Sequence, residues 1–134
     1  MMKTPEKSIL IVDDEPGFHD MLRYLLEPLG FIVHSAHDGL EGLECVRRQN
    51  YDIIFLDVHM PKMRGPELLK IIKELKPMQF VVMMSSGSDP RQVLEQTAKE
   101  LGAMACLFKP FEISQVLETI QHAAVPGPSL KNLC

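Results

Sequence analysis

Two short apolar runs in this sequence each end in acidic residues. The run Ile53–Leu56 is followed by Asp57, and the run Ser8–Val12 is followed by Asp13 and Asp14. Uninterrupted apolar runs of this length are typical of strands buried in a parallel sheet, and ligands bind at the carboxyl ends of such strands. Asp57 could therefore act as a metal ligand, a nucleophile or a helix cap, and the rest of the chain must decide among these roles.

Asp13 and Asp14 favour a metal site at this edge of the predicted sheet. Carboxylates that share one edge repel one another, and the repulsion raises at least one pKa unless a cation is present. Mg²⁺ relieves the repulsion because it prefers oxygen ligands and leaves positions for a substrate phosphate. The alternative is that one of the two acids only caps the helix expected to begin near Pro16. A cap explains a single acid as well as a metal does, but it explains a pair beside Asp57 poorly.

Ser85 and Lys109 follow the fourth and fifth apolar runs of the chain. A hydroxyl group at the carboxyl edge of a sheet can donate a hydrogen bond to a phosphoryl group, and a lysine at the end of an apolar strand is costly unless it meets an anion. Each residue also has an ordinary explanation, since Ser85 opens a loop before a helix capped by Asp89 and Lys109 could be a surface lysine. Pro110 favours a functional role for Lys109, because an X-Pro bond that is cis in a tight turn would fix the direction of the Lys109 ammonium group.

Taken together, these residues predict a site for phosphoryl transfer. A carboxylate can attack phosphorus and form an acyl phosphate, which makes Asp57 the candidate nucleophile. A metal ion and Lys109 would neutralise the oxygen atoms of the transferring group, which is most of what phosphoryl transfer requires. Ser85 would offer its hydroxyl group to the same phosphoryl oxygen atoms.

Five apolar runs alternate with five helical patterns, and these elements must position the site. The predicted strands are Ser8–Val12, Phe31–Ser35, Ile53–Leu56, Phe80–Met84 and Met104–Phe108. The predicted helices are Pro16–Leu26 (with Phe18, Met21, Leu22 and Leu25 at helical spacing), Gly39–Gln49, Pro66–Leu75, Pro90–Leu101 and Ile113–Val125. The alternation predicts an α/β, doubly wound (βα)5 fold, a flavodoxin-like three-layer sandwich whose five-stranded parallel sheet has the order 2-1-3-4-5. In this order the ends of the first and third strands, which carry the acids, lie side by side.

The composition is that of a single soluble domain. A length of 134 residues suits one core, and a net charge of −4 gives no electrostatic reason to expect nucleic-acid binding. No apolar stretch approaches the roughly 18–20 residues that span a bilayer. Cys45, Cys106 and Cys134 have neither disulfide nor metal spacing, which predicts reduced thiols and a cytoplasmic location. The histidines at positions 19, 34, 37 and 122 also show no shared metal spacing.

The motifs at the strand ends resemble those of the receiver domain of two-component response regulators. They are Asp13-Asp14, the loop Asp57-Val58-His59-Met60-Pro61-Lys62-Met63-Arg64-Gly65, Ser85-Ser86 and Lys109-Pro110-Phe111. The resemblance covers residues 8–125, which leaves residues 1–7 as an amino-terminal extension and 126–134 as a carboxyl-terminal tail or the start of a linker.

The resemblance implies a role for each site residue. Asp57 would accept a phosphoryl group from a phosphohistidine on a sensor histidine kinase or a histidine phosphotransfer protein. Asp14 would bind Mg²⁺ (or Mn²⁺) directly together with Asp57, Asp13 would bind it through water, and His59 would bind it through its backbone carbonyl. Ser85 would be the switch hydroxyl and Lys109 the charge partner of the phosphoryl group.

The resemblance also implies a signalling domain rather than an enzyme with its own substrate. Such a domain promotes its own phosphorylation and autodephosphorylation, does not itself bind nucleic acid or a membrane, and signals through protein contacts. The surface formed by residues 90–125, which spans the fourth helix, the fifth strand and the fifth helix, is expected to contact a downstream protein or effector domain. The same surface would form a phosphorylation-dependent dimer.

Three positions depart from the family pattern or tune it. Cys106 stands three residues before Lys109, where many receivers carry an aromatic that swings inward with the switch hydroxyl. Output would then depend on backbone shifts instead of that aromatic. His59 and Gly87 occupy positions that tune the lifetime of the phosphoryl group in the family.

Three other classes of protein fit the sequence less well. A phosphatase or mutase with an aspartyl nucleophile generally has a second acid two residues later, where this chain has His59. A flavodoxin-type flavin protein needs a hydroxyl-rich phosphate loop after the first strand, whereas Asp13-Asp14-Glu15 would repel phosphate. A receiver-like module that only mediates interactions would not need intact acids together with Lys109.

Overall fold

The computed structural model describes residues 7–86 and 90–124, in which five strands and five α-helices alternate. The strands are β1 Ser8–Val12, β2 Ile32–Ala36, β3 Ile53–Asp57, β4 Phe80–Ser85 and β5 Ala105–Phe108. The helices are α1 Pro16–Leu26, α2 Gly39–Arg48, α3 Gly65–Leu75, α4 Arg91–Leu101 and α5 Ile113–Ala124, with a short 3₁₀ helix at Glu27–Leu29. All neighbouring strands are parallel and the sheet order is β2-β1-β3-β4-β5, which confirms the predicted fold.

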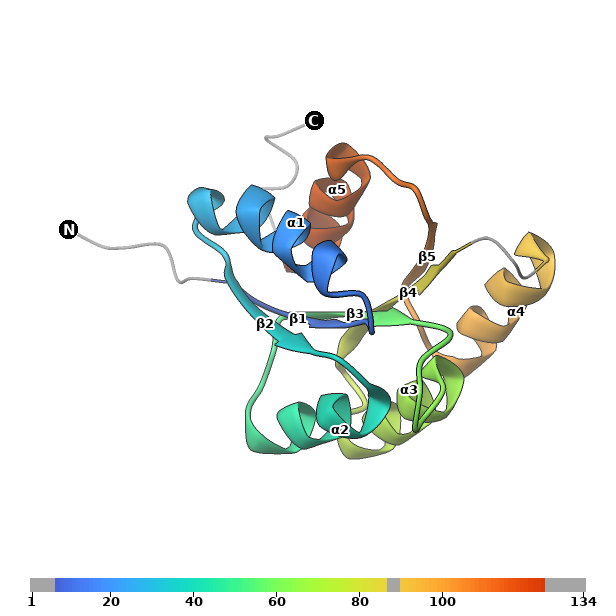
Figure 1. Ribbon diagram of the computed structural model, residues 1–134. Coiled ribbons are helices and arrows are strands. Elements are labelled where there is room, and N and C mark those ends of the chain that lie inside the picture. Colours follow the sequence, from blue (N-terminus) through green and yellow to red (C-terminus); the bar gives the residue numbers. More distant parts are fainter. Residues whose placement is uncertain (1–6, 87–89, 125–134) are drawn as a thin grey trace.

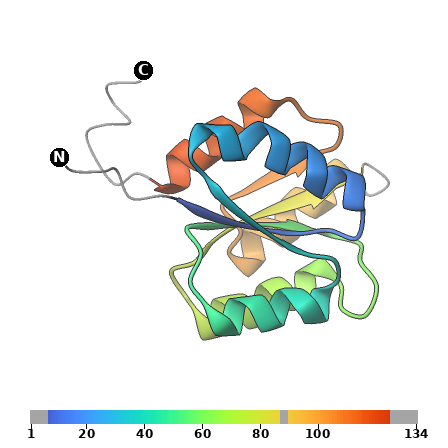
Figure 2. The same cartoon turned by 60° about the vertical axis from the view of Figure 1, so that its left-hand side comes forward.

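Helices cover both faces of the sheet, so the molecule has three layers (Figures 1 and 2). Helices α1 and α5 lie on one face, and α2, α3 and α4 lie on the other. Each face has its own core: Leu22 and Val116 pack with Phe55 on the first, and Val46 and Leu68 pack on the second. Residues 53–56 of β3 are fully buried because the central strand is covered on both sides, which explains its uninterrupted apolar run.

Most element boundaries agree with the sequence prediction to within one residue. Strand β3 extends to Asp57 and β4 to Ser85, because these residues pair in register with Met84 and Phe108 of the neighbouring strands. Val125, the predicted end of α5, lies outside the described residues. The prediction missed the 3₁₀ helix after α1. Gly30 follows this short helix and has a φ of 98°. Glycine adopts this backbone conformation without the steric cost of a Cβ atom.

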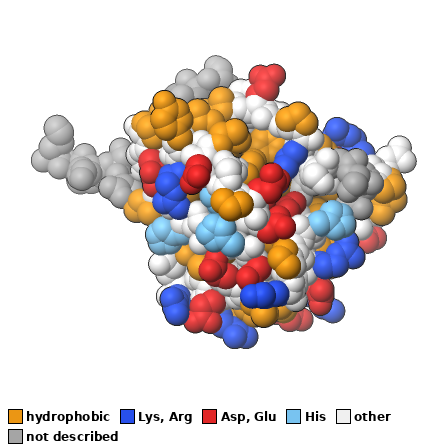
Figure 3. Space-filling view, in the orientation of Figure 1, with side chains coloured by type: hydrophobic (Ala, Val, Ile, Leu, Met, Phe, Trp, Pro, Cys, Tyr) orange, Lys and Arg blue, Asp and Glu red, His pale blue; other side chains and the backbone are white. Residues whose placement is uncertain are grey.

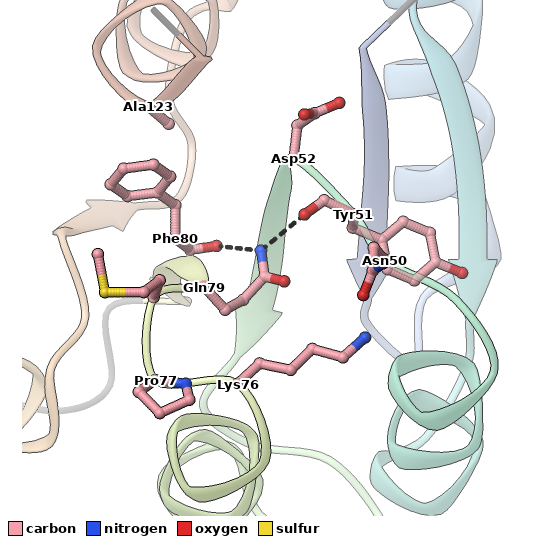
Figure 4. A pocket seen from close by; sticks show the side chains of 9 residues that line it. Asn50, Tyr51, Asp52, Lys76, Pro77, Gln79, Phe80 and Ala123 are labelled. Carbon is pink, nitrogen blue, oxygen red and sulfur yellow. Dashed lines mark hydrogen bonds between the residues drawn. The ribbon is translucent and has the colours of Figure 1, made fainter. Parts of the chain in front are cut away.

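The amino-terminal edge of the sheet is closed by hydrogen bonds around a cavity of about 410 Å³ (Figure 4). The Gln79 side-chain amide donates to the carbonyl groups of Tyr51 (3.0 Å) and Phe80 (3.1 Å). The Lys76 ammonium group donates to two carbonyl groups at the end of α2, at 2.6 and 2.7 Å. None of the helices in the described part of the chain has the length and apolar character that a membrane span needs.

Candidate functional site

Asp57 is the last residue of β3, and its side chain lies at the carboxyl-terminal edge of the sheet with 6% of its surface exposed. The loop that follows passes close to the backbone of two glycines, Gly39 and Gly65. A Cβ atom on Gly65 would collide with the carbonyl oxygen of Asp57, and one on Gly39 would lie 2.5 Å from Met63. Lys62, with a φ of 72°, forms an ion pair with Asp38 at 3.4 Å. These contacts fix the path of the loop next to the Asp57 carboxylate.

The structure brings Asp13, Asp14 and Asp57 together. One carboxylate oxygen from each lies within 4.8 Å of those of the other two. Asp13 is fully buried, whereas Asp14 is exposed. The alternative that Asp13 or Asp14 caps α1 does not hold, because the N-cap residue of α1 is Glu15 and no side chain caps it. Asp13 instead accepts a hydrogen bond from the backbone N–H of Glu15 at 2.9 Å, within the loop before the helix.

The cluster changes the acidity of Asp57. Burial raises the pKa of Asp57 from 3.8 to about 6, and the negative charge of Asp13 adds to this effect. The positive charge of Lys109 opposes the shift without cancelling it. Burial disfavours a charge that is not compensated, so the cluster fits a hard cation that accepts several carboxylate oxygens. Among the described residues this is the one group of acidic, histidine or cysteine side chains with such a geometry.

Lys109 lies beside acidic side chains after the end of β5. Its ammonium group lies 2.5 Å from a carboxylate oxygen of Asp13 and 3.7 Å from one of Glu15. It also lies 4.3 Å from the centre of the Phe18 ring, in cation–π geometry. The Lys109-Pro110 peptide bond is cis.

Ser85 is fully buried at the end of β4, and its carbonyl group accepts a hydrogen bond from the backbone N–H of Lys109 at 2.7 Å. This bond ties the ends of β4 and β5 together. His59 is exposed in the loop after β3. Gly87 and Asp89, the latter the predicted cap of α4, lie outside the described residues, and the N-cap position of α4 is Pro90.

Cys106 points to the α4 side of the sheet. It is half-buried in β5, and its sulfur lies 3.9 Å from the carbonyl oxygen of Leu94 in α4. Burial raises the pKa of the Cys106 thiol to about 11, so the thiol stays protonated at neutral pH. An aromatic side chain does occur two residues later, where the Phe108 ring lies 3.8 Å beneath the guanidinium group of Arg91.

His19 is a buried residue near the acidic cluster for which the sequence predicted no role. Its side chain is 2% exposed, and its Nε2 lies 2.6 Å from the carbonyl oxygen of Asp13. Burial lowers the pKa of His19. The available signal was the spacing of position 19 from Leu22 and Leu26, which places all three on one helical face. Met21, assigned to the inner face from its hydrophobicity, is 45% exposed.

A cavity of about 540 Å³ adjoins the acidic cluster between the start of α1 and the loop after β5. Its lining residues are Glu15, Gly17, Phe18, Met21, Ser86, Lys109, Pro110 and Phe111. The rings of Phe18 and Phe111 meet edge to face across it, with their centres 5.8 Å apart. In the space-filling view acidic side chains gather near the middle of this face, with hydrophobic side chains above them over α1 and α5 (Figure 3).

Comparison with known proteins places this fold and site in a family. The sequence matches the family described as response regulator receiver domain over residues 9–121. It is 35% identical over 129 residues to the transcriptional regulatory protein CpxR homolog of Haemophilus influenzae, covering 93% of this chain and 55% of that protein. It is 31% identical over 115 residues to sporulation initiation phosphotransferase F of Bacillus subtilis, covering 86% of this chain and 91% of that protein.

A solved structure with the same fold comes from Burkholderia pseudomallei. It is a response regulator protein with a phosphorylated aspartic acid, a calcium ion and citrate. It superposes with a TM-score of 0.79 and 25% identity, covering 89% of this chain and 69% of that one.

A parallel sheet of order 2-1-3-4-5 with acids at the ends of β1 and β3 defines a flavodoxin-like α/β protein with a candidate phosphoryl site. The chain belongs to the family of response regulator receiver domains. It spans about half the length of the Haemophilus relative and most of the Bacillus relative. The resemblance stated from the motifs alone is thereby confirmed.

Proposed function

We propose that this protein is a phosphorylation switch in a two-component phosphorelay, in which Asp57 accepts a phosphoryl group from a phosphohistidine. The donor is a sensor histidine kinase or a histidine phosphotransfer protein of the same cytoplasm. The observation that carries the proposal is the meeting of three carboxylates at one point with Lys109 beside them. The phosphorylated aspartic acid of the Burkholderia relative supports it.

The nucleophile of the reaction is a carboxylate oxygen of Asp57. It attacks phosphorus, the bond between phosphorus and the donor imidazole nitrogen breaks, and the imidazole keeps the electron pair and takes up a proton. The product is an acyl phosphate on Asp57. Only the ionised carboxylate can attack, so the raised pKa of Asp57 means that a nearby cation promotes the reaction by favouring the charged form.

The acidic cluster fits a magnesium site. Asp13, Asp14 and Asp57 would hold the ion, with Asp13 acting through water and the backbone carbonyl of His59 as a further ligand. Bound Mg²⁺, or Mn²⁺ in its place, supplies positive charge that neutralises the phosphoryl oxygens. Lys109, which forms an ion pair with Asp13, adds a second positive charge.

The switch begins when the new phosphoryl charge competes with Asp13 for Lys109. Phosphorylation adds negative charge and acceptor oxygens, which the Lys109 ammonium and the Ser85 hydroxyl group would meet. Because the backbone N–H of Lys109 donates a hydrogen bond to the carbonyl group of Ser85, the ends of β4 and β5 move together. The change then passes to the α4–β5–α5 surface, which contacts a downstream protein or effector domain or a second copy of the chain.

Phosphorylation is tested with the purified protein, Mg²⁺ and acetyl phosphate as a small phosphodonor. Intact-mass spectrometry should show one phosphoryl adduct on the wild type and none on Asp57→Asn. The matched control is Asp52→Asn, which removes a carboxylate just before the opposite end of the same strand and should be labelled like the wild type. An unlabelled wild type, or an Asp57→Asn variant labelled to the same extent, refutes the proposal.

A further inference from the structure

His19 is a polar residue on the buried face of α1. It is followed on that face by Leu22 and Leu26, which are both buried. A buried imidazole loses its hydration, and a leucine at this position would avoid that loss. The reason for a histidine here must therefore come from what the ring contacts.

The contact of His19 with Asp13 fixes the tautomer of the ring. A carbonyl oxygen can only accept a hydrogen bond, so the Nε2 atom 2.6 Å from it carries the proton and donates. In the neutral ring the Nδ1 atom then has only a lone pair, and it has no hydrogen-bond partner among the described residues. The ring therefore makes one strong hydrogen bond, and that bond goes to the backbone of a proposed metal ligand.

Four hydrogen bonds hold Asp13, and the one from His19 affects the position of Asp14. The Asp13 N–H donates to Ala36 at 3.0 Å, and its carboxylate accepts from Glu15 and Lys109. The fourth bond is to the Asp13 carbonyl, which belongs to the peptide unit that leads to Asp14. Asp14 is exposed, and no hydrogen bond within the described residues holds its carboxylate. The position of the Asp14 carboxylate therefore depends on the orientation of this peptide unit.

A second ring restricts the movement of His19. The His37 ring lies 4.5 Å from it, measured between centres, and is inclined by 45°. His37 is itself held in the loop before α2, where its backbone N–H donates to the Glu41 carboxylate at 2.5 Å. His19 is thus enclosed between the helix that carries it and the loop before α2.

We propose that His19 is a positioning residue for the divalent-cation site, because its bond to the Asp13 carbonyl fixes the peptide unit that places Asp14. The inference rests on the proposed magnesium site and adds a residue that acts through another residue rather than on the ion. Residues that orient metal ligands from behind typically change metal affinity by about 10- to 100-fold when they are replaced.

The test compares His19→Leu with His19→Gln in magnesium titrations followed by isothermal calorimetry. Leucine fills the site without a donor and should weaken Mg²⁺ binding by about tenfold. Glutamine keeps an N–H at a similar reach and should bind Mg²⁺ within about twofold of the wild type, since its hydrogen bond to the carbonyl is preserved. The control is Leu22→Val on the same buried face, which loosens the α1 core without touching Asp13 and should leave Mg²⁺ affinity unchanged.

A second measurement needs no metal. Nitrogen-15 NMR of the wild-type imidazole should show the proton of His19 on Nε2, and the amide signals of Asp14 and Glu15 should shift in His19→Leu but much less in His19→Gln. Equal Mg²⁺ affinity of His19→Leu and wild type, or an Nδ1-protonated ring, overturns the inference. Equal weakening in Leu22→Val does so too, because it would reveal a general packing effect. A wild type that binds no Mg²⁺ overturns the proposed metal site itself. A His19→Leu variant that binds Mg²⁺ as tightly as a wild type that does bind it overturns only this inference.

Discussion

Asp57 is held at the end of β3 in surroundings that favour its protonated form. Because its pKa is about 6 in the folded protein and 3.8 ordinarily, the folded state binds more protons than the unfolded state between these pH values. The free energy of unfolding therefore contains a contribution from Asp57 that falls as pH rises from about 4 to 6 and is constant above. A shift of two pKa units corresponds to about 3 kcal/mol.

The Asp57→Asn variant isolates this contribution. In a chelator, the variant should be more stable than the wild type by about 3 kcal/mol at pH 7, and the difference should shrink toward pH 4. Urea unfolding at several pH values measures it. The difference between the two proteins is the relevant quantity, because other acids affect both proteins equally. The hydrogen bond from the Glu41 N–H lowers the pKa of Asp38, for example, so the contribution of Asp38 to the free energy of unfolding rises with pH in both. A difference that is independent of pH would contradict the prediction.

Lys109 compensates the buried charge of Asp13, so replacing it by methionine should leave that charge unpaired. Breaking a buried pair in this way costs about 3 kcal/mol or more, and urea unfolding of Lys109→Met in a chelator should show a loss of this size. The variant also has a more negative site, so saturating Mg²⁺ should raise its unfolding midpoint by more than that of the wild type. An equal or smaller magnesium effect in the variant would show that Lys109 and the ion do not serve the same charge.

The elements were predictable because local patterns specify them strongly. Uninterrupted apolar runs predicted the strands, and the polar residues at or just after the ends of β1, β3, β4 and β5 predicted the candidate site. The contacts within the site were not predictable in the same way. The sequence predicted a phosphoryl group as the charge partner of Lys109 but did not predict the ion pair with Asp13, since the direction of a long side chain depends on which anion is nearest in space.

The buried face of α1 shows the limit of helical periodicity. Hydrophobicity placed Met21 inside and gave His19 no role, yet His19 is buried and Met21 is 45% exposed. The spacing of Leu22 and Leu26 sets the phase of the helix, and the Asp13 carbonyl can accept the proton of an inward imidazole. A pattern based on hydrophobicity does not include backbone acceptors, so it cannot recognise a buried histidine of this kind.

The junction of β3 with α3 has no room for a side chain at Gly65. A Cβ atom there would lie 2.9 Å from the Cα of Val58 and would collide with the carbonyl of Asp57. Gly65→Ala should therefore lower the free energy of unfolding by about 2 kcal/mol or more, since the backbone must shift, and should slow phosphorylation of Asp57. Thermal unfolding and labelling with acetyl phosphate measure the two effects.

Gly17 in the first turn of α1 is the matched control for Gly65. A Cβ atom at Gly17 meets nothing within 4 Å. Alanine there should leave labelling unchanged and raise stability by up to about 1 kcal/mol, because it reduces the freedom of the unfolded chain. Equal changes of stability in the two alanine variants would mean that the close approach at Gly65 has no specific cost.

The two edges of the sheet have opposite electrostatic designs across the whole molecule. The carboxyl-terminal edge gathers three acids, one of which forms an ion pair with Lys109, so added positive charge is expected to stabilise it. The amino-terminal edge pairs its polar groups internally, as the bonds of Gln79 in Figure 4 show. The first edge can respond to a change of charge, whereas the second has its polar groups already satisfied and serves to hold the strands and helices in place.

Lys76 tests whether the two edges act independently. Its ammonium group joins the ends of α2 and α3 by donating to the carbonyls of Val46 and Gln49. Hydrogen bonds from a charged donor contribute more than neutral ones, so Lys76→Met should lower the free energy of unfolding by about 2 kcal/mol. β3 separates this edge from Asp57 by about 13 Å, and substitutions so far apart add independently.

Mg²⁺ affinity and labelling of Asp57 should accordingly stay within about twofold of the wild type in Lys76→Met. Lys70→Met is the control for the lost charge, because Lys70 is an exposed lysine of α3, the helix that Lys76 caps, and its loss should change stability little. Urea unfolding, calorimetric titration and intact-mass labelling of the three proteins provide the comparison. A loss of Mg²⁺ affinity in Lys76→Met that matches its loss of stability would show that the amino-terminal edge controls the geometry of the acids, and that the sheet couples its two edges.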